Sequence, residues 1–345
     1  MSQAWAPRPS DAATIHAPLP ATVHRGLVAS GAAGTRPRRL SGNGTRRPAD
    51  RSRRRPTPTV SIVIPAHDEE EVIERCLLAA ADQTVAAWEI LVVDNRSSDA
   101  TSSIARRVAE RHPDARIRVI TQHAQVGLIP TRDIGFVVAS GDVLGRIDAD
   151  TVIGRDWVEQ VTAAMRDPAV GAVSGPVAYY DLPFRGPAVS DDLARRALRR
   201  LGRRYPFLYG CNMAIRASAW REIRDEVCPD PLDLLHEDID LSVHLYDAGI
   251  AVRYLPAMRA GASARRLSSS PAAFNAYVER FERTYAAHGI DEWYLRAPQL
   301  LLKAAYWWAR VLHAVVPARR AAPAPAVRAD AVDTATTQQP EAVPA

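Results

Sequence analysis

The chain has 345 residues, of which 47% are hydrophobic and three are cysteine, so it can bury one large core or two small ones. The three cysteines show no C-x-x-C spacing, which argues against a disulfide framework and a zinc site and favours a reducing, cytoplasmic compartment. The net charge of +5 is uneven: residues 1–59 hold 11 Arg and 2 Asp, a net +9, which leaves −4 for the remainder. The basic character therefore belongs to the N-terminal segment rather than to the expected folded body.

Residues 1–58 and 318–345 lack apolar periodicity and are rich in Pro, Ala and other small residues, so we expect a disordered leader and a disordered tail. An Arg-rich leader is also compatible with contact to nucleic acid or anionic lipid. We expect a solvated leader and no nucleic-acid partner. The N-terminus shows no apolar segment after its charges, so no signal peptide is predicted.

Residues 300–317 form the most apolar late stretch, but Lys303, Arg310 and His313 interrupt it. The stretch is shorter than the roughly 20 apolar residues that a spanning helix needs. We therefore expect an amphipathic helix over 291–317 that docks on the folded body. Peripheral contact with the inner face of a membrane is the alternative.

Between the terminal segments, short Val- and Ile-rich runs alternate with segments of helical periodicity. Strands whose sequence is a continuous apolar run are typical of a parallel sheet with helices on both faces. The pattern predicts strands at 59–66, 89–94, 116–121 and 143–148, and helices at 68–83, 98–112 and 132–140.

Acidic residues follow several of these predicted strands. Asp94 ends the second strand and Asp148 ends the fourth, while Pro65, Ala66 and His67 belong to the end of the first. In parallel sheets, ligands bind beyond the carboxyl ends of the strands. We therefore expect these residues at one edge of the sheet, beside a ligand.

The segment GRIDADTVIG (145–154) places Asp148 and Asp150 two residues apart after an apolar run. Such carboxylates repel each other unless a cation lies between them, and Mg²⁺ or Mn²⁺ prefers oxygen ligands of this kind. A solvated turn and an acid pair for proton transfer are the alternatives that this pattern alone leaves open.

Five motifs resemble, in order, those of the family 2 glycosyltransferases. They are VSIVIPAHDEEEVIERCL, EILVVDNRSSDAT, VGLIPTRDIGFVVASGDVLGRIDAD, GCNMAIR and HEDIDLSVHLYDAG, and together they span about residues 60–290. The resemblance implies the GT-A fold, with a Rossmann-like, mostly parallel sheet and helices on both faces. It implies one transferase domain over 59–290, with a nucleotide-sugar-binding half at 59–153 and an acceptor-binding half at 154–290.

The resemblance also implies site residues. Binding of the nucleotide-sugar is assigned to Pro65, Ala66, His67, Glu69, Asp94, Arg132 and Asp148. Asp94 would accept a hydrogen bond from the base, and Arg132 would lie near the nucleotide or its phosphates. Asp150 would coordinate a divalent metal, Mg²⁺ or Mn²⁺, together with Asp148. Asp238 would be the catalytic base, with Glu237 beside it.

These roles imply an inverting transferase that moves one sugar, with a UDP-sugar as the default donor, to the hydroxyl of an unknown glycan, lipid or small-molecule acceptor. Processive synthases of the family carry a Q-x-x-R-W segment, whereas the equivalent residues 262–271 read ASARRLSSSP, so we expect a non-processive enzyme of cell-envelope glycan synthesis.

The basic segment 179–207 is interpreted as an insertion near the acceptor. Gly210 and Asn212 are interpreted as a stretch of backbone that a sugar approaches closely.

Two other functions use similar residues. A nucleotidyltransferase would carry a Gly-rich loop with a basic residue after the first strand, but the sequence there is PAHDEE. A sugar-nucleotide-binding protein without activity is the second alternative, and the presence of Asp94, Asp148, Asp150 and Asp238 argues against it.

Overall fold

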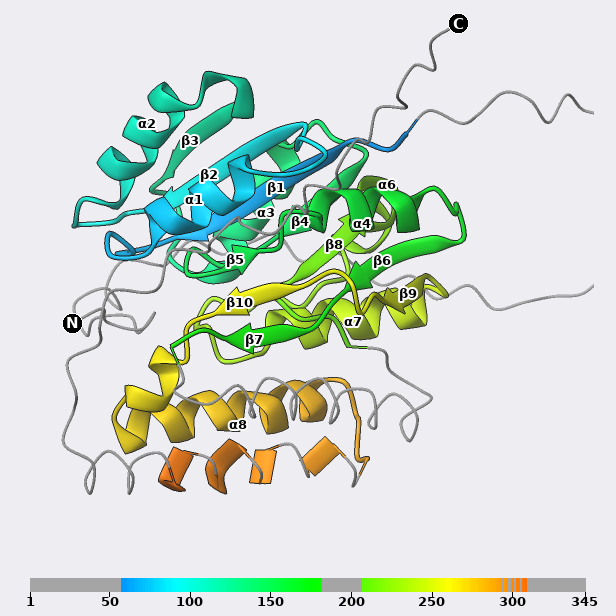
Figure 1. The fold of residues 1–345 in the computed structure, drawn as a ribbon. Coiled ribbons are helices and arrows are strands. Elements are labelled where there is room, and N and C mark those ends of the chain that lie inside the picture. The colour runs from blue at the N-terminus through cyan, green and yellow to red at the C-terminus, as the bar shows by residue number, and fades with distance from the viewer. Residues whose placement is uncertain are drawn as a thin grey trace, which may run out of the picture.

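The computed structural model contains one large sheet, one small sheet and helices that pack against both (Figure 1). The predicted leader and tail, and most of the basic insertion, lie outside the described residues. The structure describes residues 57–181, 207–292, 295–296, 299–300, 302–304 and 306–308.

The strands and helices alternate through the N-terminal half, as the sequence predicts. The strands are β1 Val60–Ala66, β2 Glu89–Asn95, β3 Ile117–Gln122, β4 Val143–Arg146, β5 Val152–Ile153, β6 Val170–Ser174, β7 Val177–Tyr179, β8 Met213–Arg216, β9 Ala251–Tyr254 and β10 Ala260–Ala262. The helices are α1 Ile73–Ala81, α2 Thr101–Arg111, α3 Leu128–Val138, α4 Trp157–Met165, α6 Ala217–Ile223, α7 Glu237–Asp247 and α8 Pro271–Ala287, with short 3-10 turns η2 Pro113–Ala115 and η3 Arg265–Ser268.

The large sheet has the strand order β3-β2-β1-β4-β8-β6-β9. Strands β1 to β4 pair in parallel, which confirms the predicted parallel sheet. Strand β8 runs antiparallel to both β4 and β6, and the sheet is therefore mostly parallel. Because β4 pairs with β1 on one side and β8 on the other, the sheet continues from the N-terminal to the C-terminal half of the chain.

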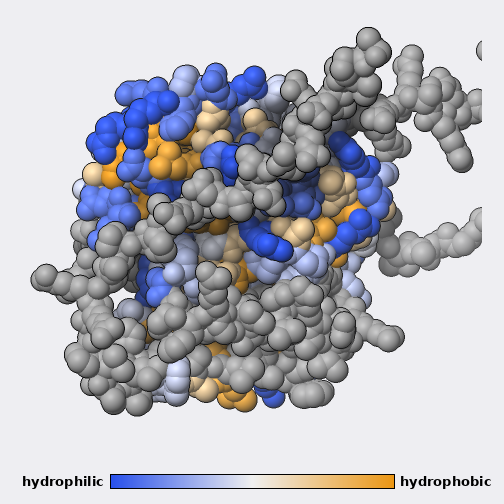
Figure 2. Space-filling model, viewed as in Figure 1, coloured by the Kyte–Doolittle hydropathy of each residue, from blue (hydrophilic) through white to orange (hydrophobic). Residues whose placement is uncertain are grey.

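Each face of the large sheet is covered by its own set of helices. Ile62 and Ile64 of β1 face a core that also contains residues of α1, α2 and α4. Val63 of the same strand faces the opposite core, with residues of α3, α6 and α7. Burial on both faces explains why β1 and β2 are apolar without alternation. Outside these contacts, hydrophilic residues cover much of the described surface around α1 and α2 (Figure 2).

Helix α1 starts later than predicted. The expected helix at 68–83 begins at Ile73, because the acidic residues before it are held in a loop. Asp68 has a left-handed backbone with φ of 52°, and the Glu69 amide donates to Thr101 Oγ1 at 2.7 Å. The acidic residues thus join the ends of β1 and β2 rather than form a first helical turn.

Two further boundaries differ from the prediction. Helix α3 begins at Leu128 instead of residue 132, after Gly127, whose φ of 130° suits glycine. Strand β4 ends at Arg146, so Asp148 lies in the following loop rather than on the strand. Strands β5, β7 and β10 form a small three-stranded sheet that the sequence pattern did not predict.

Helix α8 packs beside the C-terminal helical residues, which run alongside it in Figure 1. The rings of Phe274 and Tyr306 stack with centroids 3.9 Å apart, and Val278 belongs to the same cluster. Trp307 and Trp308 are exposed on the other side. Within the described residues, none of the helices combines the length and the apolar character that crossing a bilayer would require.

Candidate active site

The carboxyl ends of β1, β2 and β4 meet at one edge of the large sheet. Ala66 pairs with Asp94, and Val63 pairs with Arg146, which precedes Asp148 by two residues. This register brings the residues after β1, Asp94 and Asp148 to the same edge, as expected from the strand pattern.

Asp94 is buried and organises the loop that follows β2. Its carboxylate accepts hydrogen bonds from Ser102 Oγ at 2.5 Å and from the Ser97 amide at 3.2 Å. His67 Nδ1 lies 2.7 Å from the Asn95 carbonyl, a geometry in which Nδ1 carries the proton. At the start of α2, Asp99 Oδ1 accepts a hydrogen bond from the Thr101 amide at 2.9 Å.

Asp150 is almost buried beside two other charged residues. Arg265, from η3, places its Nε 3.3 Å from Asp150 Oδ2. The same guanidinium donates to both carboxylate oxygens of Glu69 at 2.5 Å each. Burial and repulsion from Asp148 raise the pKa of Asp150 to about 7. Glu69, Asp148 and Asp150 therefore form an acidic group around the Arg265 guanidinium.

Asp148 lies at the exposed end of a chain of ion pairs that leads into the protein. Its Oδ1 is 2.5 Å from Nη2 of the buried Arg146. Nη1 of Arg146 is 2.9 Å from Oε1 of Glu237 on α7. Arg132 on α3 contacts the other Glu237 oxygen at 2.5 Å. Although burial opposes ionisation, Arg146 and Arg132 lower the pKa of Glu237, which is therefore an anion between two cations.

Arg132, which the resemblance assigns to nucleotide-sugar binding, lies inside the protein beside Glu237. Its side chain is fully buried, pairs with Asp133 and Glu237, and lies 5.4 Å from the Trp220 ring centroid. Helix α3 covers the sheet face shared with α7, and the Arg132 guanidinium neutralises Glu237 within that layer.

Asp238 lies at the first turn of α7, next to Glu237. Its Oδ2 accepts a hydrogen bond from the Gly210 amide at 2.9 Å, and Oδ1 accepts from the Ile239 amide at 2.9 Å. Burial, followed by repulsion from Glu237, raises the pKa of Asp238 to about 6. A carboxylate with a raised pKa, a partly exposed side chain and both oxygens oriented by backbone amides is suited to accept a proton near neutral pH.

Gly210 and Asn212 have structural roles. A β-carbon at Gly210 would overlap Nη1 of Arg146 and come 2.9 Å from Glu237 Oε1. Asn212 is fully buried; its Oδ1 accepts from Trp157 Nε1 at 2.7 Å, and its Nδ2 donates to the carbonyls of Pro176 and Met258. The glycine leaves room for the ion-pair chain, and the asparagine joins three segments of backbone.

A divalent metal fits the acidic group. Asp148 and Asp150 offer oxygen atoms of the kind that Mg²⁺ and Mn²⁺ prefer. The two carboxylates lie close enough together for Asp148 to contribute, after burial, to the raised pKa of Asp150. Asp150 and Asp148 are therefore the residues that would hold the ion.

Sequence reasoning missed Arg146 and Arg265. Arg146 stands two residues before Asp148 in the GRIDAD segment. A charged residue inside an apolar run indicates a buried ion pair, and this signal could have identified it. Arg265 lies in the 262–271 segment, whose departure from the Q-x-x-R-W pattern does not by itself point to this arginine. Its partner Glu69 is 196 residues away, and no local pattern links the two.

Comparisons with known proteins agree on one family. Glycosyltransferase AglE of Haloferax volcanii is 32% identical over 124 residues, which cover 35% of this chain and 40% of that protein. Probable glycosyltransferase YdaM of Bacillus subtilis is 30% identical over 219 residues, which cover 58% of this chain and 49% of that protein. The chain thus spans about half or less of the length of these curated relatives.

A solved structure has the same fold. The mannosyltransferase PcManGT from Pyrobaculum calidifontis, in complex with GDP-Man and Mn²⁺, superimposes with a TM-score of 0.52 over 76% of both chains, at 21% identity. The model of glycosyl transferase family 2 matches residues 61–224, and that of glycosyl transferase family group 2 matches residues 146–324. The chain therefore belongs to the family 2 glycosyltransferases and has their GT-A fold.

Proposed function

We propose that this chain is a metal-dependent, inverting, non-processive glycosyltransferase, which moves one sugar from a nucleotide-sugar to an acceptor hydroxyl. The observation that carries the proposal is the ion-pair chain from Asp148 through Arg146 to Glu237. It joins the acidic group at the sheet edge to the helical turn that presents Asp238. A proton acceptor and an acidic site for a metal and diphosphate are thereby held in one framework.

Asp238 is the proposed base. The Gly210 amide orients its Oδ2, and Glu237 beside it stays ionised between two arginines. Asp238 takes the proton from the acceptor hydroxyl as that oxygen attacks the anomeric carbon. Attack from the face opposite the nucleoside diphosphate inverts the configuration. The new bond joins the acceptor oxygen to the sugar, and the diphosphate leaves with the electrons of the broken bond.

The donor binds at the ends of β1, β2 and β4 in this proposal. Pro65, Ala66, His67 and Asp94 line the nucleotide side, as the family resemblance implies. A divalent ion held by Asp148 and Asp150 would neutralise the negative charge of the diphosphate. Glu69 acts through Arg265, because their bidentate pair holds the guanidinium beside Asp150.

The proposed donor is a nucleotide-sugar. UDP-sugar is the default for the family resemblance, whereas the structural neighbour contains GDP-Man. Relatives named O-antigen biosynthesis protein and N-acetylglucosaminyltransferase support a role in surface glycan synthesis. The proposed domain is 59–290, in a cytoplasmic protein, with peripheral membrane contact through residues 300–317 as the alternative to docking on the folded body.

A direct test measures thermal unfolding with UDP, GDP or dTDP, each with and without Mn²⁺. A nucleotide at about 100 times its dissociation constant stabilises by about 2.7 kcal/mol, which raises Tm by several degrees. We expect a metal-dependent shift with one nucleotide that is lost in Asp150→Asn and kept in Asp114→Asn, an exposed aspartate of the same half.

Two outcomes would contradict parts of the proposal. A nucleotide shift that is equal with EDTA and Mn²⁺ would mean that Arg265 alone supplies the positive charge. A metal-dependent shift without sugar transfer to any glycan or lipid acceptor, and without hydrolysis of the matching nucleotide-sugar, would favour the binding protein without activity.

A further inference from the structure

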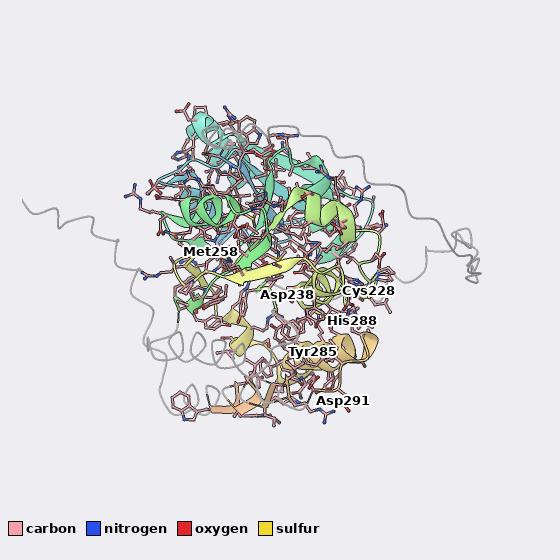
Figure 3. The ribbon with its side chains drawn as sticks, turned by 90° about the vertical axis from the view of Figure 1, so that its right-hand side faces the viewer. Cys228, Asp238, Met258, Tyr285, His288 and Asp291 are labelled. Atoms are coloured by element: carbon pink, nitrogen blue, oxygen red, sulfur yellow. The ribbon has the colours of Figure 1, made fainter. Side chains whose placement is uncertain are left out.

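A second cluster of metal-ligating side chains lies away from the acidic group at the sheet edge. Cys228 follows α6, Asp240 and His244 are one turn apart on α7, and His288 directly follows α8. One ligand atom from each residue lies within 4.8 Å of every other. In Figure 3, the labelled residues Cys228 and His288 lie close together.

The individual distances approach those of a tetrahedral site. Cys228 Sγ is 3.9 Å from His244 Nε2 and 4.0 Å from His288 Nε2. Asp240 Oδ1 is 3.4 Å from His244 Nε2 and 2.8 Å from His288 Nε2. Zinc bonds of about 2.0–2.3 Å at tetrahedral angles place neighbouring ligand atoms roughly 3.4–3.6 Å apart. Changes of up to about 1.4 Å in the ligand-to-ligand distances would therefore complete the geometry.

The orientation of Asp240 is already suited to such a site. Its Oδ2 accepts a hydrogen bond from the Cys228 amide at 3.2 Å, which leaves Oδ1 toward both imidazoles. Asp240 is fully buried, and the side chains of His244 and His288 are 16% and 9% exposed. Four protein ligands in a closed environment are typical of a structural zinc site rather than a catalytic one, which keeps an open position.

We propose that Cys228, Asp240, His244 and His288 form a structural site for one transition-metal ion, with Zn²⁺ as the resident ion. One thiolate, two imidazoles and one carboxylate favour zinc over Mg²⁺ or Mn²⁺, which prefer oxygen ligands. Because Cys228 lies 12 residues before Asp240, 16 before His244 and 60 before His288, no short cysteine–histidine motif marks the site.

A bound zinc ion would change the protonation of the cluster. A thiol that coordinates zinc loses its proton outright. Binding would then release that proton and leave a thiolate and a carboxylate neutralising the dication.

The site would join α7 to α8 and to the segment after α6. Asp240 lies two residues beyond Asp238 on the same helix, so the ion would hold the turn that presents the proposed base. This role goes beyond sugar transfer and is independent of the metal proposed at Asp148 and Asp150.

The test measures bound metal rather than activity. The full chain is prepared as the double variant Asp148→Asn/Asp150→Asn, which removes the acidic site, and its zinc content is determined by elemental analysis. We expect one equivalent of Zn²⁺. Adding Cys228→Ser/His288→Gln should abolish it, whereas the matched pair Cys211→Ser/His123→Gln should keep it.

Cobalt provides a readout that does not depend on the folding of the cluster variants. The protein with intact cluster is stripped with a chelator, which we expect to lower Tm by at least about 5 °C, and is titrated with Co²⁺. A thiolate-to-cobalt charge-transfer band and intense tetrahedral d–d bands that saturate at one equivalent support the site. A cobalt spectrum without the thiolate band, or equal zinc content with and without the cluster, would show only a hydrogen-bonded group of side chains.

Discussion

Arg146 and Glu237 form a buried ion pair, with Nη1 and Oε1 2.9 Å apart, which links the end of β4 to the first turn of α7. The second Arg146 nitrogen binds Asp148 at 2.5 Å, so one side chain contacts a residue of the proposed metal site and the neighbour of the proposed base. Because both partners are nearly inaccessible to solvent, each depends on the other for neutralisation.

Glu237→Gln tests this dependence. The substitution preserves shape but leaves Arg146 and Arg132 without their shared anion, and removing one partner of a buried pair typically costs 3–5 kcal/mol. We expect the free energy of unfolding, measured by urea denaturation, to fall by about 3 kcal/mol. Glu279→Gln removes an exposed pair with Arg283 and should cost less than about 0.5 kcal/mol. Equal losses in both variants would refute the structural role of Glu237.

Gly210→Ala tests the space that the ion-pair chain requires. The added methyl group would overlap Arg146, and a misfit of this kind in a packed interior costs about 1–3 kcal/mol. Gly154→Ala is the control, because its β-carbon would meet the flexible Asp156 side chain at 3.2 Å and the Arg259 carbonyl at an ordinary contact distance of 3.4 Å. A calorimetric Tm that falls for Gly210→Ala and changes little for Gly154→Ala is the expected result.

Asp238→Asn tests the assignment of the base. The amide keeps the size of the side chain but cannot accept the acceptor proton, so kcat should fall by about 10²- to 10⁴-fold. Donor binding, followed by calorimetry, should be unchanged. Asp247→Asn alters an exposed aspartate on the same helix and should keep full activity. Retention of more than a tenth of the wild-type kcat in Asp238→Asn would exclude this base.

Arg265→Gln tests the competition between a guanidinium and a metal at Asp150. Loss of the positive charge beside Asp150 and Glu69 should strengthen binding of free Mn²⁺ by about 3- to 10-fold, near 1 kcal/mol. Arg283→Gln, far from the acidic group, is the matched control. Titration calorimetry without nucleotide measures both, and weaker Mn²⁺ binding in Arg265→Gln would place the ion elsewhere.

His236 gives the stability of the protein a defined pH dependence. Its ring packs 3.9 Å from the Phe281 ring, its Nε2 has no hydrogen-bond partner, and burial lowers its pKa to about 3. The unfolded chain binds a proton near pH 6.5, so the stabilisation is complete above that pH and is lost as pH falls toward 3. Between pH 7.5 and 5.5 the loss should be about 1.4 kcal/mol.

The pH effect of His236 is isolated by comparing variants. His236→Gln has no titrating ring and should show a smaller decrease in stability over the same interval, by up to that amount. His123→Gln, an exposed histidine, should retain the wild-type dependence. Parallel curves for wild type and His236→Gln would contradict the assignment.

The sequence alone determined the strand and helix alternation, the parallel N-terminal sheet and the edge at which Asp94 and Asp148 lie. These features follow from periodicity within single elements and from the rule that parallel strands end together. The late start of α1 was not predictable in this way, because Glu69 is held by Thr101, 32 residues further along the chain.

Only the tertiary structure decided which charges meet. Arg132 and Glu237 are 105 residues apart, Glu69 and Arg265 are 196 apart, and neither pair has a sequence signature. The same holds for Cys228 and His288, whose separation conceals the proposed zinc site. Local patterns report which face of an element is buried, whereas the partner of a buried charge depends on how distant elements pack, and that is a property of the folded chain.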